Sequence, residues 1–192
     1  MRKLLLLLTC CAALSACVTP RPAIGPALPW DQRLIQLQHA GAWSLDGRAA
    51  VAVGTQGWQA SLNWRQRGSD AVLHLSGPLG VGALVIEQTP AGLSLNGAPP
   101  SAAVLAQLQE RLGFDLPLST LRFWLLGVPD PRSPFDLARN DQDRVRQLTQ
   151  DGWSVAYDRY LPVAGDSLPT RLVLSRDTVK VKIAVDHWEN PR

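Results

Sequence analysis

From Trp43 onward, hydrophobic and polar residues alternate with a period of two. Trp43, Leu45 and Val51 fall on one side of this alternation, and Asp46 and Arg48 fall on the other. A second alternating run covers residues 58–64, and a short stretch, Gly54-Thr55-Gln56-Gly57, separates the two. Two such runs joined by a short glycine-containing turn predict an antiparallel hairpin.

The same pattern continues through most of the chain. Further strands are predicted at residues 71–75, 81–86, 93–95, 135–139, 144–149, 153–157, 168–175 and 179–185. With the first hairpin this makes about ten strands, with room for an eleventh, and the short turns between them indicate a meander. A sheet of this size in one domain is expected to close, or nearly close, into an antiparallel β-barrel, because closure removes exposed edges.

Three segments depart from the period of two and predict helices. Apolar residues recur at helical spacing in residues 30–39, 101–112 and 119–126. Ser101 is suited to cap the start of the second helix, and Gly113 is suited to end it. We expect the second and third helices to lie across the sheet or to fill its mouth, because their apolar faces need a partner.

The polar sides of the strands exclude a membrane-spanning barrel. Charged residues occupy the outward positions, where a lipid-facing band would be apolar: Asp46, Arg65, Asp158, Lys180 and Lys182. The inward positions are rich in Trp, Leu, Val and Ala. An apolar cavity is therefore predicted inside the sheet, since side chains do not always fill a barrel this wide.

The N-terminus has the pattern of a lipoprotein signal. Arg2 and Lys3 precede an apolar run of about a dozen residues, which is too short to span a bilayer comfortably. The run ends in Leu14-Ser15-Ala16-Cys17, which resembles a lipobox. The resemblance implies a signal peptide at residues 1–16 and acylation of Cys17. The alternative is ordinary signal cleavage that leaves Cys17 as a free thiol.

Three regions follow from this pattern: the signal peptide, a proline-rich tether with the acylated cysteine at residues 17–29, and one folded domain at residues 30–192. In bacterial lipoproteins, an Asp directly after the acylated Cys commonly marks retention in the inner membrane. Val18 occupies that position, so we expect the chain to be anchored by Cys17 on the periplasmic face of the outer membrane.

Composition and charge narrow the function further. All three cysteines lie at positions 10, 11 and 17, so the predicted domain has neither a disulfide nor a thiolate metal site. The formal net charge of +3 includes Arg2 and Lys3, which leave with the signal peptide. The near-neutral remainder argues against nucleic-acid binding.

The sequence offers no candidate for catalysis. His39, His74 and His187 do not stand in any metal-ligand spacing, and no nucleotide-binding or nucleophile motif is present. We therefore expect neither an enzyme nor a cofactor nor a metal site. A hydrolase acting on envelope lipids or glycans is an alternative for which no nucleophile and base can be named.

One turn of the predicted sheet has an unusual residue at its tip. Gly77-Pro78-Leu79-Gly80 joins two apolar strands, and its Pro and Gly residues suit a tight turn. Burying a leucine side chain contributes roughly 1.5–3 kcal/mol, so Leu79 is expected either to fold back on the core or to contact another apolar surface.

An ordered set of short motifs resembles the LolB family of outer-membrane lipoprotein receptors. No single motif is specific, but together they run in order over almost the whole predicted mature chain. They are Trp43-x-x-x-Gly47-Arg48, Gly57-Trp58-x-Ala60-Ser61 with Trp64, Ser76-Gly77-Pro78-Leu79-Gly80, Leu112-Gly113-x-x-Leu116-Pro117, Leu121-Arg122-x-Trp124-Leu125-x-Gly127-x-Pro129, Gln150-x-Gly152-Trp153-x-Val155-x-Tyr157, Tyr160, Leu168-Pro169 and Lys180-x-Lys182-Ile183 before Trp188.

The resemblance implies both a fold and a function. The fold would be an incompletely closed antiparallel β-barrel with a helical lid over an apolar cavity. The protein would act as a monomer, accept acylated lipoproteins from the periplasmic carrier LolA and insert them into the inner leaflet of the outer membrane. Leu79, held out by Gly77, Pro78 and Gly80, would then contact the bilayer and act in insertion rather than in acceptance. The alternative from another class is a scaffolding lipoprotein that binds an envelope protein through a sheet edge.

The alternation also nominates an acyl-chain cavity. The residues predicted to line its wall are Trp58, Leu62, Trp64, Leu73, Leu84, Ile86, Val155, Leu172 and Ile183, with Trp124 and Leu125 on the lid.

Overall fold

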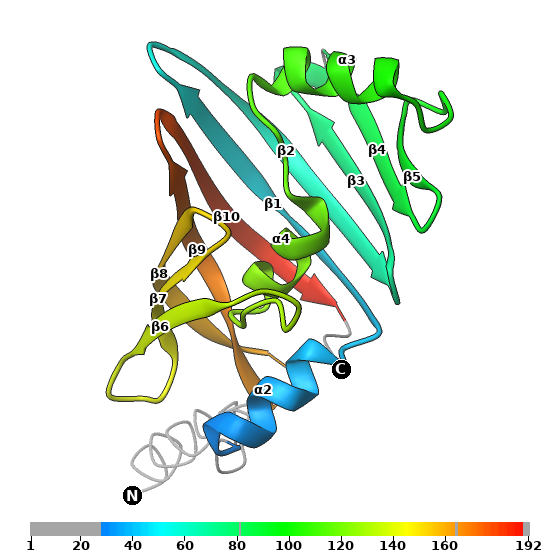
Figure 1. Ribbon diagram of the computed structural model, residues 1–192. Coiled ribbons are helices and arrows are strands. Elements are labelled where there is room, and N and C mark those ends of the chain that lie inside the picture. Colours follow the sequence, from blue (N-terminus) through cyan, green and yellow to red (C-terminus); the bar gives the residue numbers. More distant parts are fainter. Residues whose placement is uncertain (1–27, 81, 164, 190–192) are drawn as a thin grey trace, which may run out of the picture.

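The computed structural model describes residues 28–80, 82–163 and 165–189. Its centre is one antiparallel sheet of ten strands in the order β5-β4-β3-β2-β1-β10-β9-β8-β7-β6 (Figure 1). The strands are β1 (Ala42–Val53), β2 (Gln56–Arg67), β3 (Asp70–Ser76), β4 (Leu84–Thr89), β5 (Gly92–Leu95), β6 (Phe135–Arg139), β7 (Val145–Gln150), β8 (Trp153–Val163), β9 (Asp166–Arg176) and β10 (Val179–Glu189).

The first and last strands meet in the middle of the sheet. β1 pairs with β10 on one side and with β2, along its whole length, on the other. Because every other pairing joins consecutive strands, β5 and β6 are left at the two ends of the order and do not pair with each other. The predicted incompletely closed sheet is confirmed, with ten strands and no closure into a barrel.

A glycine permits the close approach of β1 and β10. The register between these strands shifts between Asp46 and Gly47. A Cβ atom at Gly47 would lie 2.2 Å from the carbonyl oxygen of Ala184, which no side chain tolerates. Such irregularities increase local twist and bend a strand. The bend lies near the middle of the sheet, where curvature turns the two outer halves toward each other.

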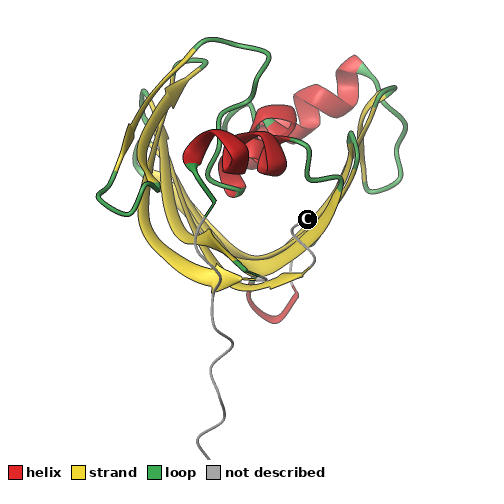
Figure 2. Ribbon diagram, turned by 90° about the horizontal axis from the view of Figure 1, so that it is seen from below, coloured by secondary structure: helices red, strands yellow, loops and turns green. Residues whose placement is uncertain are grey.

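The curved sheet has an apolar concave face and a polar convex face. Helices α3 (Ala102–Leu112) and α4 (Leu118–Leu125) lie on the concave side, as Figure 2 shows. The buried hydrophobic core forms one cluster between them and the strands. The charged residues that the alternation places outward are exposed: Asp46, Arg65, Asp158, Lys180 and Lys182.

The predicted helices are confirmed to within one residue at each end, and the second of them has the predicted caps. Ser101 caps α3, because its side chain accepts a hydrogen bond from the Val104 N–H at 3.2 Å. Gly113 ends α3 in the left-handed conformation with φ of +83°. The first helix, α2 (Trp30–Gln38), lies at the lower end of the molecule in Figure 1.

The prediction was wrong at the connection after β3. We expected a tight turn followed by a strand from residue 81, but β4 begins at Leu84. Pro78–Gly80 instead form one turn of 3₁₀ helix, η2, in which the Gly80 N–H donates to the Gly77 carbonyl oxygen at 2.9 Å. Gly80 and Gly82 both have positive φ, which interrupts extended backbone and delays the next strand.

Candidate functional site

The candidate site is the apolar space between the concave face and the helices. We call α3, residues 113–117 and α4 the lid. The lid and four strands enclose a small cavity lined by Ala49, Val51, Trp58, Leu62, Trp64, Leu73, Leu75, Leu112, Phe114, Leu116, Leu121, Leu125, Val181 and Ile183. Each of these residues is apolar, so the cavity offers packing surface and no charge.

The free volume in this cavity is about 30 Å³. A buried water molecule needs a free volume of roughly 10–15 Å³, so the cavity is comparable in size to a few waters. An acyl chain of about 16 carbons is far larger, and its methylenes would each contribute about 0.8 kcal/mol on burial. The described structure is therefore closed to a long apolar ligand, which needs the lid and the sheet to move apart.

The C-terminal half of the lid is held by a buried polar network. The Trp124 indole N–H donates to Gln150 Oε1 at 2.9 Å, and the Asp130 backbone N–H donates to the same oxygen at 2.9 Å. Gln150 Nε2 in turn donates to the Asp130 carbonyl oxygen at 2.7 Å. The buried amide of Gln150 thus has hydrogen-bond partners on both its oxygen and its nitrogen. Such a network holds the end of α4 over β7.

Two tyrosines lie near the same end of α4, and one of them is hydrogen-bonded to it. The Tyr157 hydroxyl donates to the Trp124 carbonyl oxygen at 2.9 Å, and the Tyr160 hydroxyl donates to the Val145 carbonyl oxygen at 2.7 Å. Burial raises the pKa of both hydroxyls above the ordinary value, so both remain neutral donors. Gly127, with φ of +77°, packs closely against Tyr160 and Pro169. A Cβ atom at this position would lie only 3.0 Å from the side chains of both residues.

The N-terminal half of the lid is held mainly by apolar packing. Val104, Leu108 and Leu112 are the buried residues of α3. A hydrogen bond from the Trp58 indole N–H to the Leu112 carbonyl oxygen, at 3.3 Å, links the end of α3 to β2. The two halves of the lid therefore differ, with α4 fixed by buried hydrogen bonds and α3 resting on an apolar surface.

The η2 turn lies on the other side of the sheet. Figure 2 shows this single helical turn outside the curve of the sheet, whereas α3 and α4 lie inside it. Pro78 and Gly80 are exposed, and Gly77 is partly buried. The backbone of Leu79 belongs to η2, but its side chain lies outside the described part of the structure.

Residues 41–188 match the model of the family described as outer membrane lipoprotein LolB. The chain belongs to the LolB family. The match starts just before β1 and ends at the penultimate residue of β10, so it includes the lid and all of the sheet except its last residue.

Two curated relatives support this family. The chain is similar to the outer-membrane lipoprotein LolB of Nitrosococcus oceani, with 31% identity, 88% of this chain and 87% of the relative covered. It is also similar to the outer-membrane lipoprotein LolB of Pseudomonas aeruginosa, with 33% identity over 97% of this chain and 96% of the relative.

A solved structure supports the LolB-family fold alone. A LolA superfamily protein from Nitrosomonas europaea superposes with a TM-score of 0.53 and 9% sequence identity, covering 85% of this chain and 94% of the other. The half-open sheet with helices on its concave side is thus common to this LolB family member and a LolA superfamily protein.

The eleven residues predicted to line an acyl-chain cavity are distributed around the concave side. Ten of them are buried in the core, and Trp58 is partly buried. Six border the small cavity: Trp58, Leu62, Trp64, Leu73, Leu125 and Ile183. Leu84, Ile86, Trp124, Val155 and Leu172 are packed elsewhere in the core. That these residues contact acyl chains remains a prediction.

Sequence reasoning missed much of the lid surface of the cavity. Leu112, Phe114, Leu116 and Leu121 all border it. The helical spacing of Leu112 and Leu121 was visible, but nothing local showed that Phe114 and Leu116 of the connection also turn inward. The polar network around Gln150 was missed as well, because a glutamine at a strand end gives no sign of burial.

Other predictions concern parts that the structure leaves undescribed. Cys17, the signal peptide and most of the tether lie outside the described residues. None of the helices in the described residues has the length and hydropathy needed to cross a bilayer. Within those residues, no group of three or more His, Cys, Asp or Glu side chains is arranged to hold a metal ion.

Proposed function

We propose that this protein accepts acylated lipoproteins from the periplasmic carrier LolA, holds their acyl chains against the concave face and inserts them into the inner leaflet of the outer membrane. Membership of the LolB family supports the role in the outer membrane. The observation that carries the proposal is the apolar cavity beneath a lid that is tied firmly at only one end.

Physical chemistry explains why such a receptor needs a covered apolar surface. An acyl chain of about 16 carbons exposes on the order of 12 kcal/mol of unfavourable surface to water. A triacylated protein therefore cannot cross an aqueous space without shielding. Transfer between carrier, receptor and bilayer then follows differences in affinity, and each tenfold preference requires only about 1.4 kcal/mol.

The closed cavity sets the order of events. Because about 30 Å³ is free, acyl chains enter only as α3 separates from the strands beneath it. The Trp124 and Tyr157 hydrogen bonds hold α4 in place during this movement. Gly113, whose left-handed backbone separates α3 from the rest of the lid, is the natural point of bending.

Photo-crosslinking from the acyl chain tests this proposal. The full-length acylated protein is reconstituted in vesicles and mixed with carrier that holds a lipoprotein with a photoreactive acyl chain. We expect crosslinks to peptides of β2 and the lid. Crosslinks confined to the convex face, or none while the carrier is emptied, would contradict the proposal and favour a scaffolding role.

Two alanines on β1 provide a matched pair of variants. Ala49 borders the cavity, whereas Ala52 is exposed on the other side of the strand. Ala49→Leu fills the free space and is expected to lower crosslinking to the interior by about tenfold, corresponding to about 1.4 kcal/mol. Ala52→Leu should leave it unchanged. Circular dichroism of both variants establishes that the sheet is retained.

A further inference from the structure

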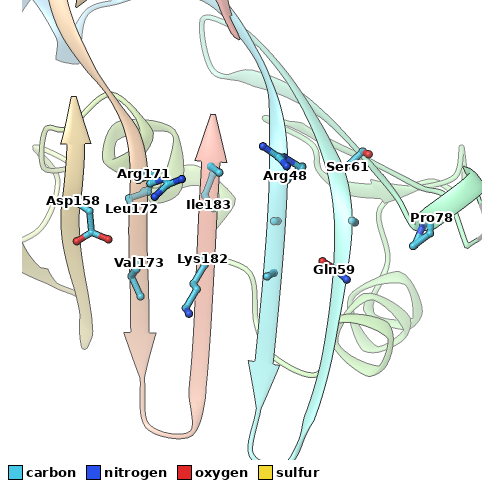
Figure 3. Close-up of a pocket in the computed structure, with 14 residues that line it drawn as sticks. Arg48, Gln59, Ser61, Pro78, Asp158, Arg171, Leu172, Val173, Lys182 and Ile183 are labelled. Atoms are coloured by element: carbon cyan, nitrogen blue, oxygen red, sulfur yellow. The ribbon is translucent and has the colours of Figure 1, made fainter. Parts of the chain in front are cut away.

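A second hollow lies on the convex face of the sheet, on the side opposite the lid. We call it the outer groove. It has a volume of about 760 Å³, within the range of roughly 300–1,000 Å³ common for small-ligand sites. Figure 3 shows the residues that line it, among them Arg48, Gln59, Pro78, Asp158, Arg171 and Lys182.

The floor of the outer groove is made of small residues flanked by cations. Ala184 of β10 lies between Arg48 of β1 and Arg171 of β9 in the strand register. Ala50 lies beside Lys182 in the adjacent row. Since neighbouring strands are about 4.8 Å apart, the backbones that carry Arg48 and Arg171 are about 10 Å apart across Ala184.

Two of these cations have no anionic partner within the described residues. Arg48 pairs with Asp186 at 2.9 Å in an exposed ion pair. None of the ion pairs found among residues 28–80, 82–163 and 165–189 includes Arg171 or Lys182. Asp158 is the one acidic residue of the lining, and Figure 3 shows it at the far side of Arg171 from Arg48. The groove therefore combines an excess of positive charge with a single carboxylate at its edge.

The outer groove is bordered by the η2 turn. Pro78 of this turn forms part of its wall, at the end of the groove beyond Ser61 in Figure 3. Because Pro78 belongs both to η2 and to the wall of the groove, a bilayer that contacts η2 would place its headgroups beside the groove.

We propose that the outer groove binds the phosphate groups of phospholipid headgroups, with Arg171 and Lys182 as the main ligands. This inference rests on the proposed function, since it assigns the convex face beside η2 to the membrane. Asp158 would face the amine of a zwitterionic headgroup. An acidic protein surface is the competing occupant, but the shared wall with η2 favours the bilayer.

The position of the groove relative to the headgroups provides a direct test. Gln59 lines the groove, and Gln107 is exposed on α3 on the lid side. Fluorophores are attached through Gln59→Cys or Gln107→Cys in the full-length acylated protein, reconstituted in vesicles with a headgroup-level quencher. We expect strong quenching at position 59 and little at position 107. Equal quenching at both positions would overturn the proposal.

Charge substitution then tests the ligands themselves. Arg171→Gln with Lys182→Gln should lower the ratio of quenched to unquenched protein by about thirtyfold in vesicles that contain phosphatidylglycerol, since each basic residue near an anionic surface contributes about 1 kcal/mol. Arg65→Gln with Arg146→Gln removes two exposed charges outside the groove and should have little effect. No difference between the two pairs would also overturn the proposal.

Transfer measurements separate this inference from the function on which it rests. If the wild-type protein neither empties the carrier nor delivers cargo, the proposed function fails. If it does both and the groove variant delivers equally well, only the lipid site fails. If the groove variant instead stops emptying the carrier, the outer groove docks the carrier and the lipid proposal is overturned.

Discussion

Asp130 shows how single residues stabilise the end of the lid. Its side chain is 3% exposed and accepts hydrogen bonds from the backbone N–H and the guanidinium of Arg132. Burial opposes ionisation of this carboxyl, but the bonds from Arg132 outweigh burial and hold its pKa below the ordinary value of 3.8. The folded protein therefore binds a proton at Asp130 more weakly than the unfolded chain does. As a result, the ionised carboxylate stabilises the fold at pH values above the ordinary pKa.

The acid response of Asp130→Asn tests this account. The stabilisation from Asp130 is present above about pH 4 and is lost as the pH falls through the lowered pKa of the folded state. The variant should be less stable at pH 7, by about 1–3 kcal/mol, and its stability should fall less steeply below pH 4. Urea unfolding at several pH values measures both quantities.

A second variant controls for the change in net charge. Asp136 is exposed and has no ion pair within the described residues. Asp136→Asn should therefore leave stability at neutral pH nearly unchanged. If Asp130→Asn and wild type lose stability in parallel as the pH falls, the Arg132 bonds do not hold the carboxylate ionised.

At the scale of residues, the sequence predicted which face of a strand a side chain lies on better than it predicted which residues that side chain contacts. Alternation placed Trp64, Leu73 and Ile183 inward because a strand has only two faces. It could not predict that Gln150 would be buried with five hydrogen bonds, since its partners lie up to 26 residues away. Contacts of that kind depend on the connection after α4, which has no period to detect.

Among the elements, α2 is attached through a buried charge. The Arg33 side chain is fully buried, and its Nε donates to Asp166 Oδ1 at 2.8 Å at the start of β9. Its Nη2 donates to the Ser167 carbonyl oxygen at 2.7 Å. Arg144 approaches the same carboxylate at 3.6 Å. The helix that follows the tether is thus fixed to the lower end of the sheet.

Asp166→Asn should weaken this attachment strongly. The substitution leaves Arg33 buried without a counter-charge, and breaking a buried pair costs about 3–5 kcal/mol. We expect a loss near 3 kcal/mol in urea unfolding, because Asp166 is partly exposed and Arg33 keeps its bond to Ser167.

The double variant is the control for α2. Arg33→Met with Asp166→Asn removes the buried charge and should recover most of the lost stability, since buried pairs are often replaceable by apolar residues. Stability losses that simply add in the double variant would show that Arg33 and Asp166 are not coupled.

Elements with strong periodicity were predicted well, and connections were not. The helix near residue 101 was found because its apolar spacing and caps agree, and the helix near residue 119 was found from its apolar spacing. The start of β4 was misplaced because residues 81–83 are as apolar as a strand, and the positive φ values of Gly80 and Gly82 cannot be read from composition. The Arg33 ion pair was missed because a helix with one arginine on its buried side is indistinguishable from an ordinary amphipathic helix.

For the whole molecule, we assign the two proposed tasks, acceptance of cargo and contact with the bilayer, to opposite faces of the sheet. The concave face is apolar and covered by the lid, whereas the convex face carries η2 and the outer groove. Acceptance of cargo and contact with the bilayer would then be separable by mutation. The number of strands followed from the alternation, and the incomplete closure was implied by the family resemblance. The near-filled interior followed from neither, because side-chain packing across the sheet depends on the whole set of volumes.

Leu79→Glu tests this separation. A charge at the tip of η2 should not impede the lid side, so carrier emptying and crosslinking to the interior should match wild type. Delivery to vesicles should fall by more than tenfold, because a carboxylate is expensive to place at the hydrocarbon boundary. Cargo is counted in carrier, receptor and bilayer fractions.

Leu105→Glu is the matched control, because Leu105 is an exposed leucine on α3. It should leave delivery unchanged. Equal loss of acceptance and delivery in Leu79→Glu, or loss of neither, would contradict a special role for the turn.

Because the two end strands of the sheet are not paired with each other, the width of the interior can change. In a closed barrel, widening the interior requires breaking hydrogen bonds between two strands. Here β5 and β6 end the strand order, so the two halves can spread about the bent β1–β10 region with every strand pair intact. Expansion is then resisted by side-chain packing, which is graded rather than all-or-none, and by the few hydrogen bonds between the lid and the sheet. Under the proposed function, such a sheet would enclose cargoes with different acyl volumes and contract again after they leave.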